Sequence, residues 1–433
     1  MGQRAAGMPS REQLREEPFP RSRTARERAR ESLASGFARR RRVRQTAIVP
    51  GGLACVIGGM DLVRPLGLAG IGCAVVAQPG RSTRYSRFTR AVVEWADPWR
   101  EPAVLLERLM RFGSAEPEQP ALFYEGDWDL LLVSRSRERL RGAFRFVVPD
   151  AQLVEDLVDK RRFQALADRL ALPVPESRHV SPGEVDPRDL GLSFPVIVKP
   201  VTRQMATWVP IAGRAKALRA DTQRELSAIW PRFADAGFDV IVQKLVPGPE
   251  TRVESYHVYV DESGEVVGEF TGRKIRTYPA AYGFSTALEI TDAPDVGRLG
   301  RELVSRLGLC GVAKLDFKRD PAGELRLLEV NPRFNLWHHP GARAGVNLPA
   351  LVYRDLMGLP RGPLRRARAG VRWVYHRDDA RAARQAGIPL RRWLPWALSA
   401  EAKSGVTLDD PMPPARWLLS RLAGRLRAGR RLA

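Results

Sequence analysis

Residues 312–334, VAKLDFKRDPAGELRLLEVNPRF, constrain the fold of this chain more than any other stretch, because they read as one β-hairpin. Residues 312–318 and 324–330 carry the apolar side chains of two strands. The sequence Asp-Pro-Ala-Gly at residues 320–323 is typical of the turn between such strands. The segment therefore predicts two antiparallel strands side by side.

The expected register of this hairpin brings acidic side chains together. If the four residues after Asp320 form the loop, Asp320 pairs with Leu325, and Asp316 lies directly opposite Glu329. Side chains two residues apart share a face, so Asn331 lies beside Glu329. Two carboxylates facing each other with Cβ atoms ~5 Å apart repel, and a divalent cation would turn that repulsion into binding. Mg²⁺ prefers such carboxylate and amide oxygens, together with substrate phosphates.

Arg333 follows Asn331 by two residues and is placed to meet the phosphates that a metal would bring. A structural alternative stays open on these residues alone. The hairpin would then lie at the surface, and its acids would be solvated or paired with Lys314 and Lys318.

Composition sets the scale of the molecule. A chain of 433 residues predicts two to four domains. The formal net charge is +22, yet only eight of the 71 basic residues are Lys, and seven of those fall between residues 160 and 318. The chain strongly prefers arginine to lysine elsewhere. The lysines in this region therefore suggest sites that need a compact ammonium group. The spacing of the three cysteines, Cys55, Cys73 and Cys310, fits neither a metal site nor a disulfide framework. No stretch is long and apolar enough to span a membrane. We therefore expect a cytoplasmic protein.

Residues 46–148 alternate short apolar strands with helices, which is typical of a doubly wound parallel α/β domain. The sequence predicts strands at 46–52, 72–77, 121–124 and 144–148, a helix broken by glycines at 53–68, and helices at 101–111 and 130–140. The glycines at 51 and 52 do not form a dinucleotide fingerprint. The arginine run at 81–90 leaves two interpretations open, a site for an acidic substrate and a solvated loop, of which we prefer the solvated loop. Residues 1–45 are a basic leader that we expect to be disordered.

Residues 149–358 form the next predicted region, and residues 359–433 a basic helical extension. Helices are expected at 149–172, 221–233, 295–307 and 350–357, strands at 194–200, 239–246, 256–260 and 265–271, and loops at 202–208 and 335–349. Lys160 lies in the first helix and Lys199 ends the first strand. Lys274 and Arg276 are expected on one face of an extended segment.

Taken in order, these segments resemble the ATP-grasp superfamily of ligases over roughly residues 46–358. The matching motifs are the Asp159-Lys160 helix, the strands FPVIVKP and VIVQKLVPGPE, the segment GRKIRTYP and the sequence LEVNPRF. The resemblance is closest to the carboxylate–amine ligase branch that includes D-aspartate ligase and carbamoyl-phosphate-synthase-like proteins. It implies a pre-ATP-grasp domain at 46–148 and, at 149–358, two α+β subdomains that clamp ATP, the smaller at 173–245.

The same resemblance implies roles for individual residues. Phosphate contacts would come from Lys160 and Lys199, adenine contacts from Gln243, Lys244, Leu245 and Val246, and a ribose contact from Glu250. Asp316, Glu329 and Asn331 would hold one or two Mg²⁺ ions, or Mn²⁺, and Arg333, Lys274 and Arg276 would be catalytic. Beside these roles, Tyr282, Trp337, His338 and His339 form a second tier of candidates for the lining of the acyl-phosphate or amine site, with packing of the loop as the alternative for the two histidines. The loop VTRQMATW lacks the glycines of a phosphate-covering loop, and Lys244 stands where an acid is frequent.

The resemblance implies an ATP-dependent, ADP-forming carboxylate–amine ligase that acts on small molecules through an acyl phosphate. Such chemistry needs positioned reactants and neutralised charge rather than a side-chain nucleophile. The alternative is an ATP-binding regulatory or nucleic-acid-associated protein without turnover, which the +22 charge favours. Contact of the basic tails with nucleic acid or an anionic surface, and a homo-oligomer, stay open.

Overall fold

The computed structural model describes residues 51–201, 205–213, 215–405, 407 and 409–413. The chain divides into two units, and residues 48–433 hold everything described below. The expected basic leader, most of the expected strand at 46–52 and part of the loop at 202–208 lie outside the described residues.

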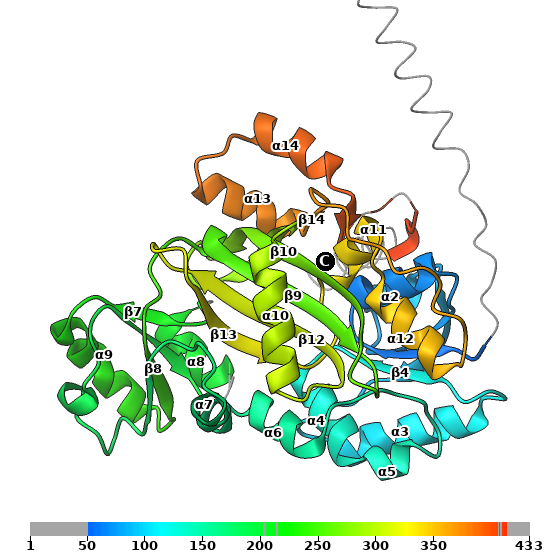
Figure 1. Ribbon diagram of the computed structural model, residues 1–433, viewed down its shortest axis with the longest axis horizontal. Coiled ribbons are helices and arrows are strands. Elements are labelled where there is room, and N and C mark those ends of the chain that lie inside the picture. The colour runs from blue at the N-terminus through cyan, green and yellow to red at the C-terminus, as the bar shows by residue number, and fades with distance from the viewer. Residues whose placement is uncertain (1–50, 202–204, 214, 406, 408, 414–433) are drawn as a thin grey trace, which may run out of the picture. The chain divides into compact units, whose positions relative to one another are not determined.

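The first sheet is parallel, with strand order β3-β2-β1-β4. It belongs to the blue and cyan part of Figure 1, where β4 is labelled. Its strands are β1 (Ala54–Ile57), β2 (Cys73–Ala77), β3 (Thr89–Glu94) and β4 (Ala121–Tyr124), and its helices are α2 (Met60–Leu68), α3 (Pro102–Ala115), α4 (Asp127–Arg135) and α5 (Arg137–Leu140). The central strands β1, β2 and β4 are buried along their whole length, as strands of parallel sheets are. The predicted doubly wound α/β architecture is confirmed.

Two expectations for this sheet were wrong, and one strand was not expected. The stretch 53–68 was expected to be a helix broken by glycines, but only its second part is helical. Residues 54–57 form β1, a strand buried on both faces, and α2 begins at Met60 after Gly58 and Gly59. Residues 144–148 form no strand and make only the isolated bridge of Arg145 to Ala121. The strand β3, which we did not expect, begins at Thr89 near the end of the arginine run and pairs with β2, while Arg81, Arg87 and Arg90 of that run are exposed.

The helical run at 149–172 is broken into α6 (Ala151–Val158) and α7 (Lys160–Arg169). The Asp159 backbone between them is extended, and its carboxylate accepts hydrogen bonds from the N–H groups of Arg161 and Arg162. Lys160 is therefore the first residue of α7 and not a mid-helix residue.

The second sheet is antiparallel, with order β5-β8-β6-β7. It contains β5 (Ser177–Val180), β6 (Val196–Pro200), β7 (Leu218–Ala220) and β8 (Val240–Lys244), with the helices α8 (Met205–Ala212) and α9 (Gln223–Asp235). Trp208, Trp230 and Phe233 fill its core. Part of the expected loop at 202–208 is thus the start of helix α8.

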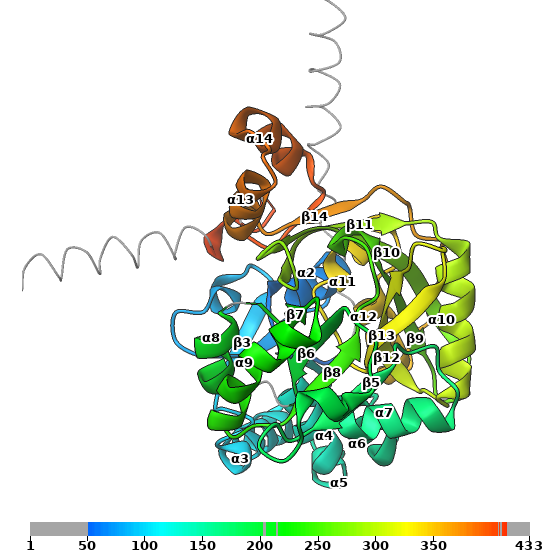
Figure 2. The same cartoon turned by 90° about the vertical axis from the view of Figure 1, so that its left-hand side faces the viewer.

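The third sheet has seven strands in the order β13-β12-β9-β10-β11-β14-β15. The strands are β9 (Val253–Val260), β10 (Val266–Tyr278), β11 (Phe284–Thr291), β12 (Gly311–Arg319), β13 (Leu325–Asn331), β14 (Arg372–Val374) and β15 (Ala402–Lys403). The helices around it are α10 (Pro294–Arg306), α11 (His338–Ala344), α12 (Leu348–Leu356), α13 (His376–Gln385) and α14 (Leu390–Ser399). The C-terminal extension therefore adds two strands to this sheet as well as helices (Figure 1, Figure 2).

The two faces of this sheet bury different partners. Tyr256 and Leu315 pack with Leu303 of α10, which lies across β9 and β12 (Figure 1). Phe270 and Trp337 belong to a second core, shared with α2, α12 and the parallel sheet. Residues 335–349 were expected to be a loop, but α11 fills part of that stretch. Among the described residues, no helix is both long and apolar enough to cross a membrane.

The predicted hairpin is confirmed, with one difference in register. Arg319, and not Asp320, pairs with Leu325, because the turn is one residue tighter than expected. A β-bulge between Asp316 and Phe317 then shifts the ladder by one residue. The two displacements cancel, and Asp316 lies opposite Glu329 as predicted.

Candidate active site

The two carboxylates of the hairpin converge on a single cation. The Nζ atom of Lys314 contacts Oδ2 of Asp316 and lies 3.6 Å from Oε1 of Glu329. Asp316 is buried, and its Oδ1 accepts a hydrogen bond from Ser255 Oγ at 2.5 Å. The pairing of the acids with Lys314, which the structural alternative expected, is therefore present. It also shows that one positive charge can reach both carboxylates.

A divalent cation fits this set of donors. Asp316 and Glu329 offer carboxylate oxygens, and Asn331 beside them is buried, with no hydrogen-bond partner on its Nδ2 atom. Across the described part of the chain, no cluster of three or more His, Cys, Asp or Glu could hold a metal by itself. A site with few protein ligands is what Mg²⁺ uses when substrate phosphates and water complete its shell.

Arg333 connects this metal-type site to the parallel sheet. Its Nε donates to Oδ1 of Asp127 at 2.5 Å, and a terminal nitrogen donates to Oδ1 of Asn331 at 3.4 Å. Burial opposes its charge, but the carboxylates of Asp127, Glu329 and Glu125 hold the pKa of Arg333 above its ordinary value. The side chain is thus a fixed positive charge, as stabilisation of a transferring phosphoryl group requires.

The two lysines predicted to contact phosphates lie at the same end of β6. Lys160 Nζ donates to the carbonyl oxygens of Pro200 and Val201, the latter at 3.1 Å. Lys199 Nζ donates to Oε1 of Gln243 at 2.9 Å. The structure therefore brings together residues from α7, β6 and β8 that are far apart in sequence.

Residues 243–246, the predicted adenine strand, end β8 and continue beyond it. The N–H group of Lys244 donates to the carbonyl of Glu176 at 2.8 Å, and that of Leu245 to the carbonyl of Pro195 at 2.9 Å. The Lys244 side chain is exposed while the other three residues are buried. Because these two N–H groups are engaged in the sheet, an adenine would have to be read by other backbone groups of this segment.

Glu250, the predicted ribose contact, lies between two lysines. Its carboxylate oxygens are 3.6 Å from Lys274 Nζ and 3.9 Å from Lys318 Nζ. Burial lowers the pKa of Lys318. Sequence reasoning assigned Lys318 only to an ion pair in the hairpin. Lys318 is one of the few lysines in this arginine-rich chain, and that property could have marked it as a candidate site residue.

Arg276 and Lys274 do not act as a pair on one face, as we expected. A β-bulge interrupts β10 between them. Lys274 approaches Glu250, whereas Arg276 makes two hydrogen bonds to the buried carboxylate of Asp379, at 2.8 and 2.7 Å. The Arg276 guanidinium also lies 4.0 Å from the centroid of the Trp396 ring. The Arg276 side chain thus binds Asp379 of α13 and packs on Trp396 of α14. These contacts favour a structural role over a catalytic one.

Three of the second-tier residues belong to the core. Trp337, His338 and His339 are buried, and burial lowers the pKa of His338 to about 3. His339 Nδ1 lies 3.1 Å from Oδ1 of the buried Asp61. These rings therefore support the sheet from behind and do not face a reacting group.

A cavity of about 390 Å³ opens at the carboxyl ends of β1, β2 and β4, where ligands bind in open parallel sheets. Glu125 and Asp129 line it, with the glycines that precede α2 and, from a separate segment, Arg81. The Gly59 N–H donates to Oε2 of Glu125 at 2.5 Å. Burial raises the pKa of Glu125 to about 7 and that of Asp129 to about 6. Sequence reasoning missed both acids, because nothing in YEGDWD shows that they are buried.

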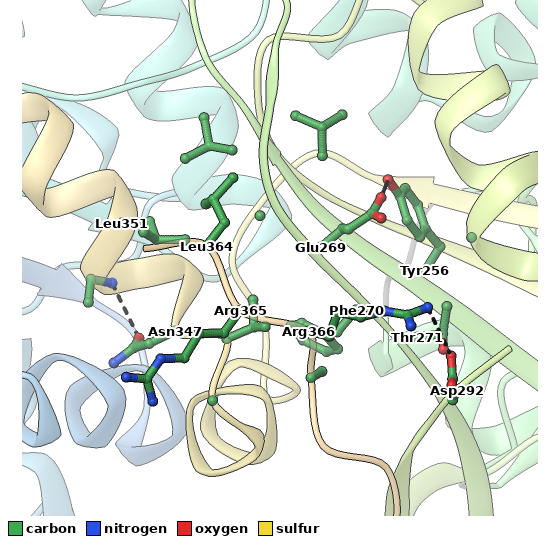
Figure 3. Close-up of a pocket in the computed structure, with 18 of the residues that line it drawn as sticks. Tyr256, Glu269, Phe270, Thr271, Asp292, Asn347, Leu351, Leu364, Arg365 and Arg366 are labelled. Atoms are coloured by element: carbon green, nitrogen blue, oxygen red, sulfur yellow. Dashed lines mark hydrogen bonds and ion pairs between the residues drawn. The ribbon is translucent and has the colours of Figure 1, made fainter. Parts of the chain in front are cut away.

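A larger cavity, about 840 Å³, lies elsewhere, between β10, α10, α12 and residues 361–367 (Figure 3). Tyr256 Oη donates to Glu269 there at 2.5 Å, and Arg301 pairs with the same carboxylate. None of the predicted site residues lines this cavity. The larger cavity volume therefore does not mark the candidate active site. We place the candidate site at the hairpin because charged side chains converge there.

Comparison with known proteins agrees with this geometry. No family model matches the chain. D-aspartate ligase from Enterococcus faecium (strain Aus0004) is 27% identical over 289 residues, which are 63% of this chain and 68% of that protein. D-alanine–D-alanine ligase from Halorhodospira halophila (strain DSM 244 / SL1) is 26% identical over 217 residues, 46% of this chain and 66% of that protein. The matched regions thus span about two thirds of each relative's length.

Among solved structures, N5-carboxyaminoimidazole ribonucleotide synthetase in complex with ADP superposes with a TM-score of 0.56 at 17% identity. The match covers 73% of this chain and 79% of that one. The chain has the ATP-grasp fold and is related in sequence to D-aspartate and D-alanine–D-alanine ligases, which confirms its resemblance to the ATP-grasp ligases.

Proposed function

We propose that this protein is an ATP-dependent, ADP-forming ligase that joins a small carboxylate to an amine through an acyl phosphate. The observation that carries the proposal is that Asp316 and Glu329 both approach the ammonium group of Lys314, with Arg333 beside them. The similarity to D-aspartate ligase supports an amino acid as one of the two substrates.

The chain's own residues account for the phosphoryl-transfer half of the reaction. Lys160 and Lys199, at one end of β6, hold the ATP phosphates, and Glu250 holds the ribose. Asp316, Glu329 and Asn331 bind Mg²⁺, which neutralises phosphate charge when bound. Arg333 stabilises the γ-phosphoryl group as it moves to the substrate carboxylate, because it is buried and charged before the reaction begins.

The cavity at the end of the parallel sheet suits the amino-acid substrate. An α-amino acid carries an ammonium group and a carboxylate. The wall of this cavity has two carboxylates and one positively charged guanidinium group. Glu125 and Asp129 bind the ammonium group, and Arg81 binds the carboxylate. A carboxylate with a pKa near 7, such as Glu125, can also take the proton that the amine must lose before it attacks. Arg333 of the metal-type site donates to Asp127 of α4, the helix that also carries Asp129.

Phosphate release from ATP tests the proposal most directly. The full-length protein is assayed with Mg²⁺ against pooled amino acids, D-aspartate among them, and pooled small carboxylates. We expect release that requires one particular pair and that falls at least about a hundredfold in Glu329→Gln. Glu324→Gln is the matched control, since Glu324 lies in the exposed turn of the same hairpin and should leave release unchanged.

Hydroxylamine distinguishes the acyl phosphate from other routes. It should trap the activated carboxylate as a hydroxamate when ATP and the carboxylate are present without the amine. ATP binding with no release from any pool and no hydroxamate would contradict the ligase and favour the regulatory, ATP-binding alternative.

A further inference from the structure

The helix α14 (Leu390–Ser399) carries an apolar stripe on its outer side. Its inner side is held by buried Trp393, whose Nε1 donates to Asp379 at 2.8 Å, and by buried Ala397. Leu390, Leu394 and Leu398 are 67%, 45% and 62% exposed. Because they are spaced four residues apart, these leucines lie along one face of the helix, away from the protein.

The chain segment that contains this stripe is strongly basic. Residues 361–403 contain eleven Arg and Lys side chains and only three acids, and α14 itself has no acid. Each of those acids is engaged: Asp379 by Arg276, Asp378 by Arg381, and Glu401 by the backbone N–H of Arg372. Arg391 and Arg392, beside the leucines, are exposed.

We propose that α14 docks on an anionic lipid bilayer. The leucine stripe enters the boundary between headgroups and acyl chains, and the flanking arginines contact the lipid phosphates. The helix lies in the plane of the surface and does not cross the bilayer. The ligase would then work beside a membrane, held there by a part of the chain that takes no role in its chemistry.

The combination of leucines and charge favours lipid over other occupants. A second copy of the chain would bring two basic surfaces together around the stripe, which costs electrostatic free energy. A nucleic acid would use the arginines but leave the leucines in water. An anionic bilayer satisfies both kinds of side chain at once.

Vesicle co-sedimentation tests the docking. Full-length protein is mixed with phosphatidylcholine vesicles that contain or lack phosphatidylglycerol. We expect binding only when the anionic lipid is present, weakened by salt. The triple variant L390Q/L394Q/L398Q should bind at least about tenfold more weakly, because each leucine loses its apolar burial. L364Q is the matched control, since Leu364 is 62% exposed but outside α14, and it should bind like the wild type.

The remaining outcomes overturn the proposal. Unchanged vesicle binding in the triple variant would place any lipid contact elsewhere in the chain. Loss of a dimer in that variant, with no lipid binding by the wild type, would assign the stripe to a second copy. Binding to duplex DNA that R391Q/R392Q abolishes, without lipid binding, would assign the surface to nucleic acid. Circular dichroism and ATP-dependent phosphate release confirm that each variant is folded, and they keep a failure of docking separate from a failure of the ligase.

Discussion

Glu125 is a residue whose burial changes what its side chain can do. It lies in the wall of the cavity at the parallel sheet, and burial raises its pKa to about 7 from an ordinary value of 4.5. A hydrogen bond from the N–H of Gly59 and the charge of Arg333 act in the opposite direction and are outweighed. The carboxylate is therefore costly to keep ionised in the folded protein.

This cost predicts a pH-dependent gain in stability for Glu125→Gln. Between pH 4.5 and 7 the folded protein binds more protons at this site than the unfolded chain, so the free energy of unfolding falls as pH rises through that window. The glutamine cannot ionise but still accepts the Gly59 hydrogen bond. At a pH of about 8 the variant should be more stable than the wild type by roughly 1–3 kcal/mol, and the difference should vanish towards acidic pH.

Thermal melting across pH measures this effect. Glu118→Gln is the control, because Glu118 is exposed in the same domain. A variant that melts like the wild type at every pH would show that Glu125 is solvated in the folded protein.

At the scale of single elements, the junction between α6 and α7 determines where Lys160 lies. Asp159 caps α7 by accepting hydrogen bonds from Arg161 and Arg162 at 2.7 and 3.1 Å. Asp150 caps α6 in the same way, with acceptor distances of 2.8 and 3.1 Å to Gln152 and Leu153. The two caps have equal geometry, but only the first one precedes a lysine that reaches β6.

We expect Asp159→Ala and Asp150→Ala to cost similar stability, about 1 kcal/mol each. Only Asp159→Ala should also raise the KM for ATP, because the first turn of α7 holds the Lys160 ammonium at the phosphate end of β6. Denaturant unfolding and ATP titration of phosphate release measure the two effects. An equal change of KM in both variants would mean that Lys160 does not contact ATP.

The hairpin of β12 and β13 shows how far sequence reasoning reaches for an element. Turn chemistry and strand patterning predicted it, and the pairing of Asp316 with Glu329 is confirmed. The one-residue error in the turn was compensated by a bulge that no local signal indicates. The break of β10 between Lys274 and Arg276 was missed for the same reason, and with it the ion pair to Asp379.

Strand β1 and helix α11 were mistaken for other structures because their state depends on burial. Residues 54–57 are buried on both faces of the sheet, Ala54 and Val56 in one core and Cys55 and Ile57 in another, so they show no alternation that separates a strand from a helix. Residues 338–344 contain Pro and Gly but are buried among the sheet and α2. Tertiary packing overrides local preference in both cases.

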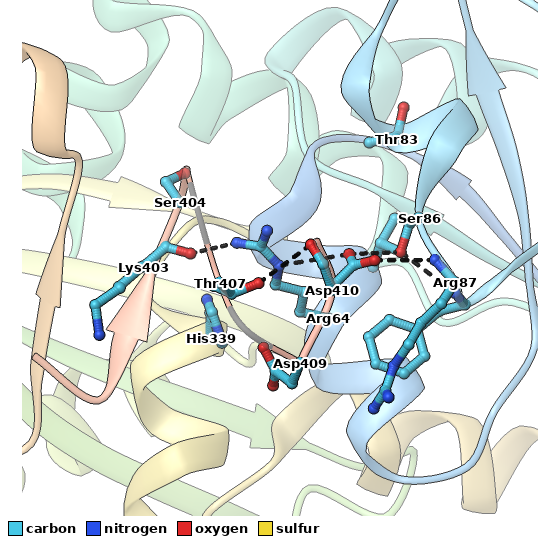
Figure 4. A network of polar contacts seen from close by, with 12 residues as sticks. Arg64, Thr83, Ser86, Arg87, His339, Lys403, Ser404, Thr407, Asp409 and Asp410 are labelled. Carbon is cyan, nitrogen blue, oxygen red and sulfur yellow. Dashed lines mark hydrogen bonds and ion pairs between the residues drawn. The ribbon is translucent and has the colours of Figure 1, made fainter. Parts of the chain in front are cut away.

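On the scale of the whole molecule, a buried polar network ties the two ends of the described chain together (Figure 4). Arg64 of α2 donates to the carbonyl oxygens of Lys403 and Gly405, the latter at 2.9 Å. Asp410 accepts hydrogen bonds from Ser86 Oγ and the Arg87 N–H, both at 2.9 Å. The C-terminal segment is thereby fixed to the parallel sheet that carries the proposed amino-acid cavity.

Asp410→Asn should therefore destabilise the whole described unit. Asp410 is fully buried, and its Oδ2 atom lies 3.8 Å from Nε of Arg64, which is itself buried. Neutralising the carboxylate removes one of the negative charges that act on the guanidinium and leaves that of Asp61. Removing one partner of a buried pair costs about 3–5 kcal/mol at most. We expect roughly 2–4 kcal/mol, since the amide keeps one acceptor and Arg64 keeps its two carbonyl partners.

Asp409→Asn is the matched control: Asp409 pairs with Arg343 where both side chains are partly exposed, so its loss should cost less than about 1 kcal/mol. Urea unfolding followed by tryptophan fluorescence separates the two variants. Equal costs would show that the Arg64 charge is screened by water, and the C-terminal segment would then add little to the stability of the parallel sheet.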